Sequence, residues 1–229
     1  MKTATYTVMF TDIVDFTERT SRQTRAQNAR LLRLHDSLLL PVIRGYLGRR
    51  VKSIGDSYLV VFDSASRALA CAAAIQDRLA AYNARVEPGD RLEVRIALSA
   101  GEVRVEGGDV FGEPVNLASR VEGIAKAGEV CFSESVYLLA DRESFAIESM
   151  GFRDLKGIPE SVGIFRLRRR EGGAVAPYGG VALAPLGLPP PTLDTLMGFR
   201  LPSPRAALAA FAAFLALAAG YLLVSWKGR

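Results

Sequence analysis

The distribution of proline constrains this chain more than any other feature of its sequence. Seven of the eleven prolines fall between residues 171 and 205. They stand at positions 177, 185, 189, 190, 191, 202 and 204. Proline lacks a backbone donor and fixes its own φ angle, so this stretch is expected to be a semi-extended linker without a core. We therefore expect a folded domain over residues 1–168, a linker rich in proline, glycine and alanine over 169–205, and a separate element after it.

The element after the linker is expected to be a transmembrane helix. Residues 206–226 run for 21 positions without a charge. As an α-helix they would measure about 31 Å, which is enough to span a bilayer. A buried or interfacial helix is the alternative, but the run is apolar on all sides. We expect a single-pass membrane protein anchored in the lipid bilayer by its C-terminus, with the domain before it in the cytoplasm and no signal peptide at the N-terminus.

The net charge of +5 belongs almost wholly to the tail. Residues 1–168 carry 23 Lys and Arg against 22 Asp and Glu, whereas residues 169–229 carry 6 against 2. A nearly neutral domain without a basic stripe argues against a nucleic-acid partner. The two cysteines, Cys71 and Cys131, are too few for a disulfide framework or a CxxC metal cage, and we expect both to be small core residues.

Hydrophobic periodicity within residues 1–168 predicts alternating strands and helices. Strand patterns occupy 6–10, 50–54, 58–62, 93–100, 129–133 and 164–167. Helical patterns occupy 17–48, 66–82 and 114–126. This order predicts an α+β domain with a ferredoxin-like βαββαβ core, extra C-terminal strands and helices, and helices on one face of the sheet.

Two carboxylates are expected at neighbouring strand ends. Asp12 follows the first strand pattern, and Asp56 lies at the tip of the predicted hairpin over 50–62. Oxygen ligands of this kind suit Mg²⁺, and the backbone amides of the loop before the next helix could hold phosphate. Asp15, at the start of that helix, is expected to cap it. Together these features indicate nucleotide chemistry.

The domain resembles the class III nucleotidyl cyclases, which convert a nucleoside triphosphate to its 3′,5′-cyclic monophosphate and pyrophosphate. The resemblance covers residues 1–168 and rests on four segments in the family's order and spacing. They are FTDIVDFT at 10–17, KSIGD at 52–56, DVFGEPVNLASR at 109–120 and LKG at 155–157. Asp15 departs from the pattern, because glycine is frequent there in the family.

The resemblance implies a metal site and a base pocket. Asp12 and Asp56, with the carbonyl of Ile13, would bind two Mg²⁺ or Mn²⁺ ions per active site. One ion would lower the pKa of the ribose 3′-hydroxyl and the other would neutralise the triphosphate. Lys52 would donate to N1 of the purine and Asp109 would accept from a 6-amino group. This polarity matches adenine, whereas guanine would require the reverse.

The remaining assignments also come from the resemblance. Asn116 would orient the ribose and Arg120 would stabilise charge developing on the α-phosphate. Lys156 would contact phosphate, and Phe16 and Thr17 would contribute to substrate binding. The alternative for Arg120 is a surface salt bridge with an acid such as Glu122.

The sequence thus predicts a membrane-anchored adenylyl cyclase that acts as a homodimer. In the family each active site is built from both chains, so Asp12 and Asp56 would act with four residues of the partner. Those four are Lys52, Asp109, Asn116 and Arg120. The alternatives are a guanylyl cyclase, and a catalytically silent, membrane-tethered module that binds nucleotide.

Overall fold

A computed structural model describes residues 2–168. The predicted linker over 169–205 and the predicted transmembrane helix over 206–226 lie outside these residues. Among residues 2–168, no helix combines the length and the apolar character needed to cross a membrane.

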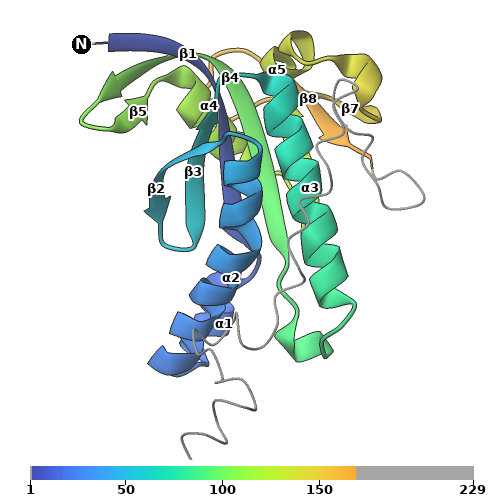
Figure 1. The fold of residues 1–229 in the computed structure, drawn as a ribbon. Helices are drawn as coiled ribbons and strands as arrows, with labels where there is room; N and C mark the ends of the chain where they lie inside the picture. Colours follow the sequence, from blue (N-terminus) through green and yellow to red (C-terminus); the bar gives the residue numbers. More distant parts are fainter. Residues whose placement is uncertain (1, 169–229) are drawn as a thin grey trace, which may run out of the picture. The chain divides into compact units, whose positions relative to one another are not determined.

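The described residues form an α+β fold around one mixed sheet of eight strands (Figure 1). The strands are β1 (Lys2–Ile13), β2 (Arg49–Ile54), β3 (Ser57–Phe62), β4 (Val94–Glu106), β5 (Asp109–Phe111), β6 (Val130–Ser133), β7 (Ile147–Arg153) and β8 (Val162–Leu167). Their order is β2-β3-β1-β4-β6-β8-β7, and β5 pairs with β4. Only β4 and β6 run parallel within this sheet. The long central strands β1 and β4 therefore connect the hairpin of β2 and β3 to the rest of the sheet.

The predicted ferredoxin-like core is present. The helices are α1 (Phe16–Ser21), α2 (Arg25–Gly45), α3 (Ala65–Asn83), α4 (Glu113–Glu122) and α5 (Glu134–Leu139). Strands β1 to β4, with α2 and α3 between them, follow the βαββαβ order, and Figure 1 shows α2 and α3 side by side against the sheet.

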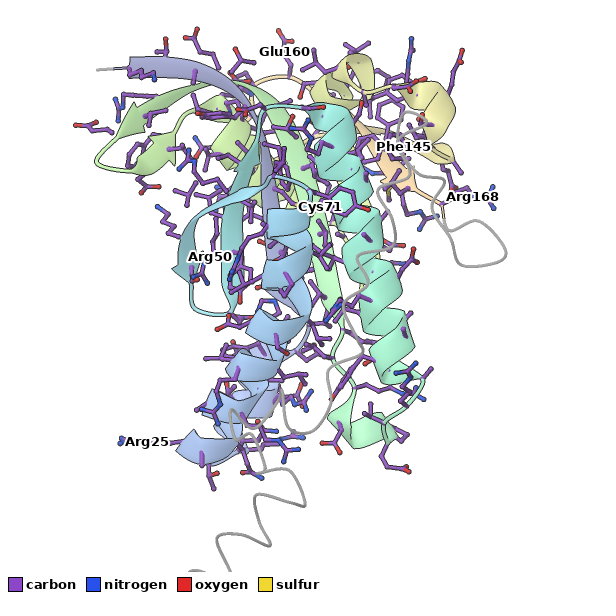
Figure 2. The ribbon with its side chains drawn as sticks, in the orientation of Figure 1. Arg25, Arg50, Cys71, Phe145, Glu160 and Arg168 are labelled. Carbon is purple, nitrogen blue, oxygen red and sulfur yellow. The ribbon has the colours of Figure 1, made fainter. Side chains whose placement is uncertain are left out.

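The prediction that both cysteines are core residues is confirmed, since Cys71 and Cys131 are both free and buried. Figure 2 labels Cys71 on α3.

The expectation that all helices cover one face is wrong for α4. Successive residues of a strand point to opposite faces. On β3, the ring of Tyr58 lies 4.5 Å from the ring of His35 on α2, whereas the next residue, Leu59, packs in a core cluster with Ala118 of α4. Helices α2 and α4 therefore cover opposite faces, and α4 supplies the crossover that the parallel strands β4 and β6 require.

The single helix predicted over 17–48 is two helices. Thr24 forms a capping box at the start of α2: its Oγ1 accepts a hydrogen bond from the Gln27 backbone N at 3.3 Å. In return, the Gln27 side chain accepts from the Thr24 backbone N at 2.8 Å. This reciprocal cap starts a new helix, so the hydrophobic pattern continues across a break that periodicity alone did not reveal.

Asp15 does not cap the helix that follows it. It occupies the N-cap position of α1 with φ 57°, and its side chain makes no capping hydrogen bond. Positive φ is the left-handed region in which glycine is least strained. The backbone therefore explains why glycine is frequent here among the proteins that the sequence resembles, and the predicted capping role is wrong.

Candidate active site

The strand end and the hairpin tip bring Asp12 and Asp56 together. Strand β1 pairs with β3 in a register that sets Thr11 opposite Tyr58, so the end of β1 lies beside the turn of the hairpin. The backbone N of Ile13 donates to Asp56 Oδ2 at 3.1 Å. Ser57 Oγ donates to Oδ1 of Asp12, a residue only 9% exposed. The two predicted metal carboxylates thus flank Ile13, as the sequence pattern suggested.

The structure adds Arg95 and Glu122, which sequence reasoning missed. Arg95 on β4 lies directly opposite Asp12 in the β1–β4 register, so both side chains share one face of the sheet. Its Nε and Nη2 donate to Asp12 Oδ2 at 2.9 and 2.6 Å. The same Nη2 lies 3.0 Å from Oε1 of Glu122, near the end of α4. The strand register is the signal that finds this cluster, and a single sequence does not give it.

Negative charge is concentrated at this strand end. Burial, followed by the nearby charge of Asp12, raises the pKa of Asp56 to about 6. The same two causes raise the pKa of Glu122 above its ordinary value. A cation bound between the aspartates would relieve this repulsion.

The donor set fits a divalent metal that is completed by substrate. Within residues 2–168 no cluster of three or more Asp, Glu, His or Cys side chains is arranged to hold an ion. Mg²⁺ usually takes only one or two carboxylates from a protein and completes its shell with phosphates and water. Asp12 and Asp56, with a backbone carbonyl at Ile13, match that requirement.

The predicted base-reading residues contact one another. Lys52 Nζ on β2 donates to Asp109 Oδ2 at 2.5 Å, although the two lie 57 positions apart. This hydrogen bond holds the pKa of the Asp109 carboxyl below its ordinary value. The Val110 backbone N donates to the other oxygen of Asp109 at 2.8 Å, which fixes the orientation of the carboxylate. The ring of Phe111 lies beside the pair, 5.7 Å from Lys52 Nζ.

Helix α4 carries Asn116 and Arg120 one turn apart, and both are exposed. Arg120 Nε donates to the backbone oxygen of Lys156 at 3.0 Å, so the structure brings these two predicted residues together. Glu122 pairs with Arg95, and the alternative of an Arg120–Glu122 salt bridge is therefore wrong.

The predicted residues fall into separate groups within one chain. Phe16 and Thr17 form the first turn of α1, just after the end of β1. Among the hydrogen bonds and ion pairs of residues 2–168, none joins Asp12 or Asp56 to the remaining predicted residues. Those residues are Lys52, Asp109, Asn116, Arg120 and Lys156.

The chain was compared with known protein families and with curated proteins. The family model for the adenylate and guanylate cyclase catalytic domain matches residues 1–168. The serine/threonine-protein kinase pkn2 of Myxococcus xanthus is 43% identical over 212 residues, which are 89% of this chain and 25% of that protein. Putative adenylate cyclase 3 of Rhizobium meliloti is 32% identical over 160 residues, 69% of this chain and 27% of that protein. The chain therefore spans about a quarter of the length of these two relatives.

Solved structures share the fold over most of their length. The adenylyl cyclase CyaB from P. aeruginosa has a TM-score of 0.66 at 25% identity, covering 76% of this chain and 100% of that chain. The guanylate cyclase domain of RhGC from Catenaria anguillulae, in complex with GTP, has a TM-score of 0.65 at 25% identity, covering 75% and 100%. This chain is therefore about equally similar to an adenylyl cyclase and to a guanylate cyclase domain.

Proposed function

Since the chain belongs to the adenylate and guanylate cyclase catalytic-domain family, we propose that it is an adenylyl cyclase, converting ATP to 3′,5′-cyclic AMP and pyrophosphate. The observation that carries the choice of ATP is the ion pair between Lys52 and Asp109. Adenine offers an acceptor at N1 and a donor at its 6-amino group, which are the partners that a lysine and an aspartate need. Guanine offers a donor at N1 and an acceptor at O6, so it would leave both charged groups mismatched.

The pair is arranged to receive a base. Without a nucleotide, Lys52 and Asp109 neutralise each other, and each side chain is partly exposed, at 39% and 26%. An adenine edge would replace this contact by a hydrogen bond to each group. A base that satisfies only one of them would bind more weakly, because the other charged group would be left without a partner. This difference in binding free energy is the physical basis of the proposed selectivity.

Asp12, Asp56 and the Ile13 carbonyl are proposed to hold two Mg²⁺ or Mn²⁺ ions per active site. Bound there, the ions would lower the pKa of the ribose 3′-hydroxyl and neutralise charge on the triphosphate. The burial of Asp12 at the end of β1, and the hydrogen bond from Ile13 to Asp56, would hold the two carboxylates close to each other. The hydrogen bond from the Ile13 N–H fixes Oδ2 of Asp56.

The remaining site residues are proposed to position the substrate. Asn116 would orient the ribose, and the planar guanidinium of Arg120 would stabilise charge on the α-phosphate. The contact of Arg120 with the Lys156 backbone holds the guanidinium at the end of α4, where both side chains can face phosphate. Phe16 and Thr17 would present backbone amides to the triphosphate next to the metal site.

The separation of these groups within one chain supports a homodimer with shared sites. Asp12 and Asp56 of one protomer would act with four residues of its partner, which are Lys52, Asp109, Asn116 and Arg120. A two-fold axis then creates two equivalent sites from one interface. Mixing inactive Asp12→Ala protein with inactive Asn116→Ala protein should restore activity, because one site in each heterodimer is wild-type. Verified subunit exchange without recovered activity would reject the shared-site arrangement.

The primary test is an assay of the purified chain with Mn²⁺ or Mg²⁺ and either ATP or GTP. We expect cyclic AMP from ATP and a much lower yield from GTP. Asp15→Gly is the matched control for Asp12→Ala: it removes a carboxylate three residues away, at a position whose positive φ suits glycine, and should retain activity. Preferred use of GTP would identify a guanylyl cyclase, and inactivity with both would favour a silent nucleotide-binding module.

The tail carries the membrane part of the proposal. The uncharged run over 206–226 lies outside the described residues, and its length supports a C-terminal anchor in a lipid bilayer with the cyclase domain on the cytoplasmic side. Carbonate washing should leave the full-length chain in the membrane pellet. A chain truncated before Arg205 should move to the supernatant and keep its activity. Release of the full-length chain by carbonate would contradict a spanning helix.

A further inference from the structure

Arg95 contacts two carboxylates, of which only one is a proposed metal ligand. Asp12 is a proposed metal ligand, and its Oδ2 receives both Nε and Nη2 of Arg95. Glu122 is not among the proposed ligands, and its Oε1 lies 3.0 Å from the same Nη2. One guanidinium nitrogen therefore already links the proposed metal ligand to a second acid on α4.

This arrangement sets a problem for metal binding. A guanidinium and a divalent cation on the same carboxylate repel each other, so binding at Asp12 favours a position of Arg95 away from Oδ2. The side chain of Arg95 is 34% exposed and that of Asp12 is 13% exposed. A charge leaving its partner in such a partly buried place is costly unless another partner takes it.

Glu122 is the second partner. Its side chain is 16% exposed, and within residues 2–168 Arg95 has ion pairs with Asp12 and Glu122 alone. Helix α4 packs on the same face of the sheet as Asp12 and Arg95, so the contact requires no rearrangement of the backbone. Moving Arg95 fully onto Glu122 would free Asp12 Oδ2 and keep the guanidinium paired.

We propose that Glu122 is a positioning residue for metal binding. When a divalent cation binds Asp12, the Arg95 guanidinium leaves Asp12 and stays paired with Glu122. The inference rests on the proposed function for the identity of the metal carboxylates. It assigns to Glu122 a role that acts through Arg95 and requires no contact with metal or nucleotide.

The test measures Mn²⁺ binding to the full chain without nucleotide, from the electron paramagnetic resonance signal of free Mn²⁺. Glu122→Gln should raise the Kd for Mn²⁺ roughly tenfold, the equivalent of losing one hydrogen bond between charged groups. Glu113→Gln is the matched control, because it removes the same charge at the exposed first turn of the same helix and should leave the Kd unchanged. Glu122→Asp keeps the charge and should retain most of the affinity.

A double-mutant cycle with Arg95→Met separates the proposed role from simple attraction. Once Arg95 is gone, Glu122→Gln should change the Kd by less than about twofold, because no guanidinium remains to be retained. An equal weakening in both backgrounds would show that Glu122 acts only as a nearby negative charge, and would overturn the proposal. An unchanged Kd in Glu122→Gln alone would also overturn it. So would Mn²⁺ binding that is the same in Asp12→Ala as in the wild-type protein.

The outcome is independent of the cyclase assay. A protein that forms no cyclic nucleotide, yet shows the Arg95-dependent effect on Mn²⁺, would retain this inference and lose the proposed function. A protein that forms cyclic AMP with an unchanged Mn²⁺ Kd in Glu122→Gln would retain the function and lose this inference. Circular dichroism of each variant confirms that the comparison is made between folded proteins.

Discussion

His35 on α2 should make the folded domain sensitive to acid. It is fully buried, both of its ring nitrogens lack a hydrogen-bond partner among the described residues, and its ring packs against Tyr58. Burial lowers the pKa of His35 from 6.5 to about 4, against the opposing charges of Asp36 and Asp12. The folded protein therefore keeps His35 neutral at a pH where the unfolded chain has already protonated its histidine.

The sign and size of the effect follow from this difference. The unfolded chain binds more protons between pH 6.5 and 4, so stability is complete above pH 6.5 and falls as the pH drops toward 4. A difference of two to three pKa units corresponds to about 3 kcal/mol of unfolding free energy. Between pH 7 and pH 4, the wild-type protein should lose about 3 kcal/mol more than His35→Phe, which keeps a ring against Tyr58 but cannot titrate.

Two measurements check this prediction. Urea unfolding followed by circular dichroism at a series of pH values gives the difference between wild-type and His35→Phe. His35 is the sole histidine of the sequence, so one imidazole resonance in an NMR titration of the untagged protein reports its pKa directly. A resonance that titrates near 6.5 in the folded protein, or parallel stability curves for the two proteins, would refute the reasoning.

Three further predictions concern the active site. Asp12→Ala or Asp56→Ala should lower cyclic AMP formation by roughly three orders of magnitude or more, because both carboxylates are proposed metal ligands; wild-type turnover in either variant would contradict this. Asp56→Ala, at the hairpin turn, should change the unfolding midpoint little, whereas Asp12→Ala should lower it, because Asp12 is bound to Arg95 and Ser57. The raised pKa of Asp56, about 6, means that Mn²⁺ must displace a proton in acid, so Mn²⁺ affinity should fall roughly tenfold between pH 7 and pH 5, and a flat titration would be the opposing result. Lys52→Glu with Asp109→Cys should lower the ATP:GTP ratio of kcat/KM, and an unchanged ratio would remove the pair from the base pocket.

Much of the fold was predictable because it depends on local pattern. The hairpin of β2 and β3 was expected from two β-rich runs around Gly55, whose φ of 63° suits a tight turn. The βαββαβ order followed from hydrophobic periodicity. The break before Thr24 was missed because the apolar spacing continues through it, although the Thr24 and Gln27 pair is a capping signal visible in the sequence.

Some residues of the candidate site could be found from the sequence and others could not. The motifs identified Asp12, Asp56, Lys52 and Asp109 because each lies in a short segment of characteristic spacing. In the structure Asp56 accepts a hydrogen bond from Ile13, the residue after Asp12, and Lys52 donates to Asp109. Arg95 lies in no such segment. Its position in a strand pattern gives no indication that a carboxylate 83 residues away faces it.

The sequence by itself determined the kinds of elements, their order and the chemistry of the side chains at strand ends and turns, since these follow from neighbours a few residues apart. Only the tertiary structure decided that α4 covers the face opposite α2, and that Asp12, Arg95 and Glu122 meet there. The physical reason is that strand register and helix placement are set by the packing of the whole core. A shift of one residue would turn Arg95 to the other face of the sheet, and no local pattern around Arg95 records which face is chosen.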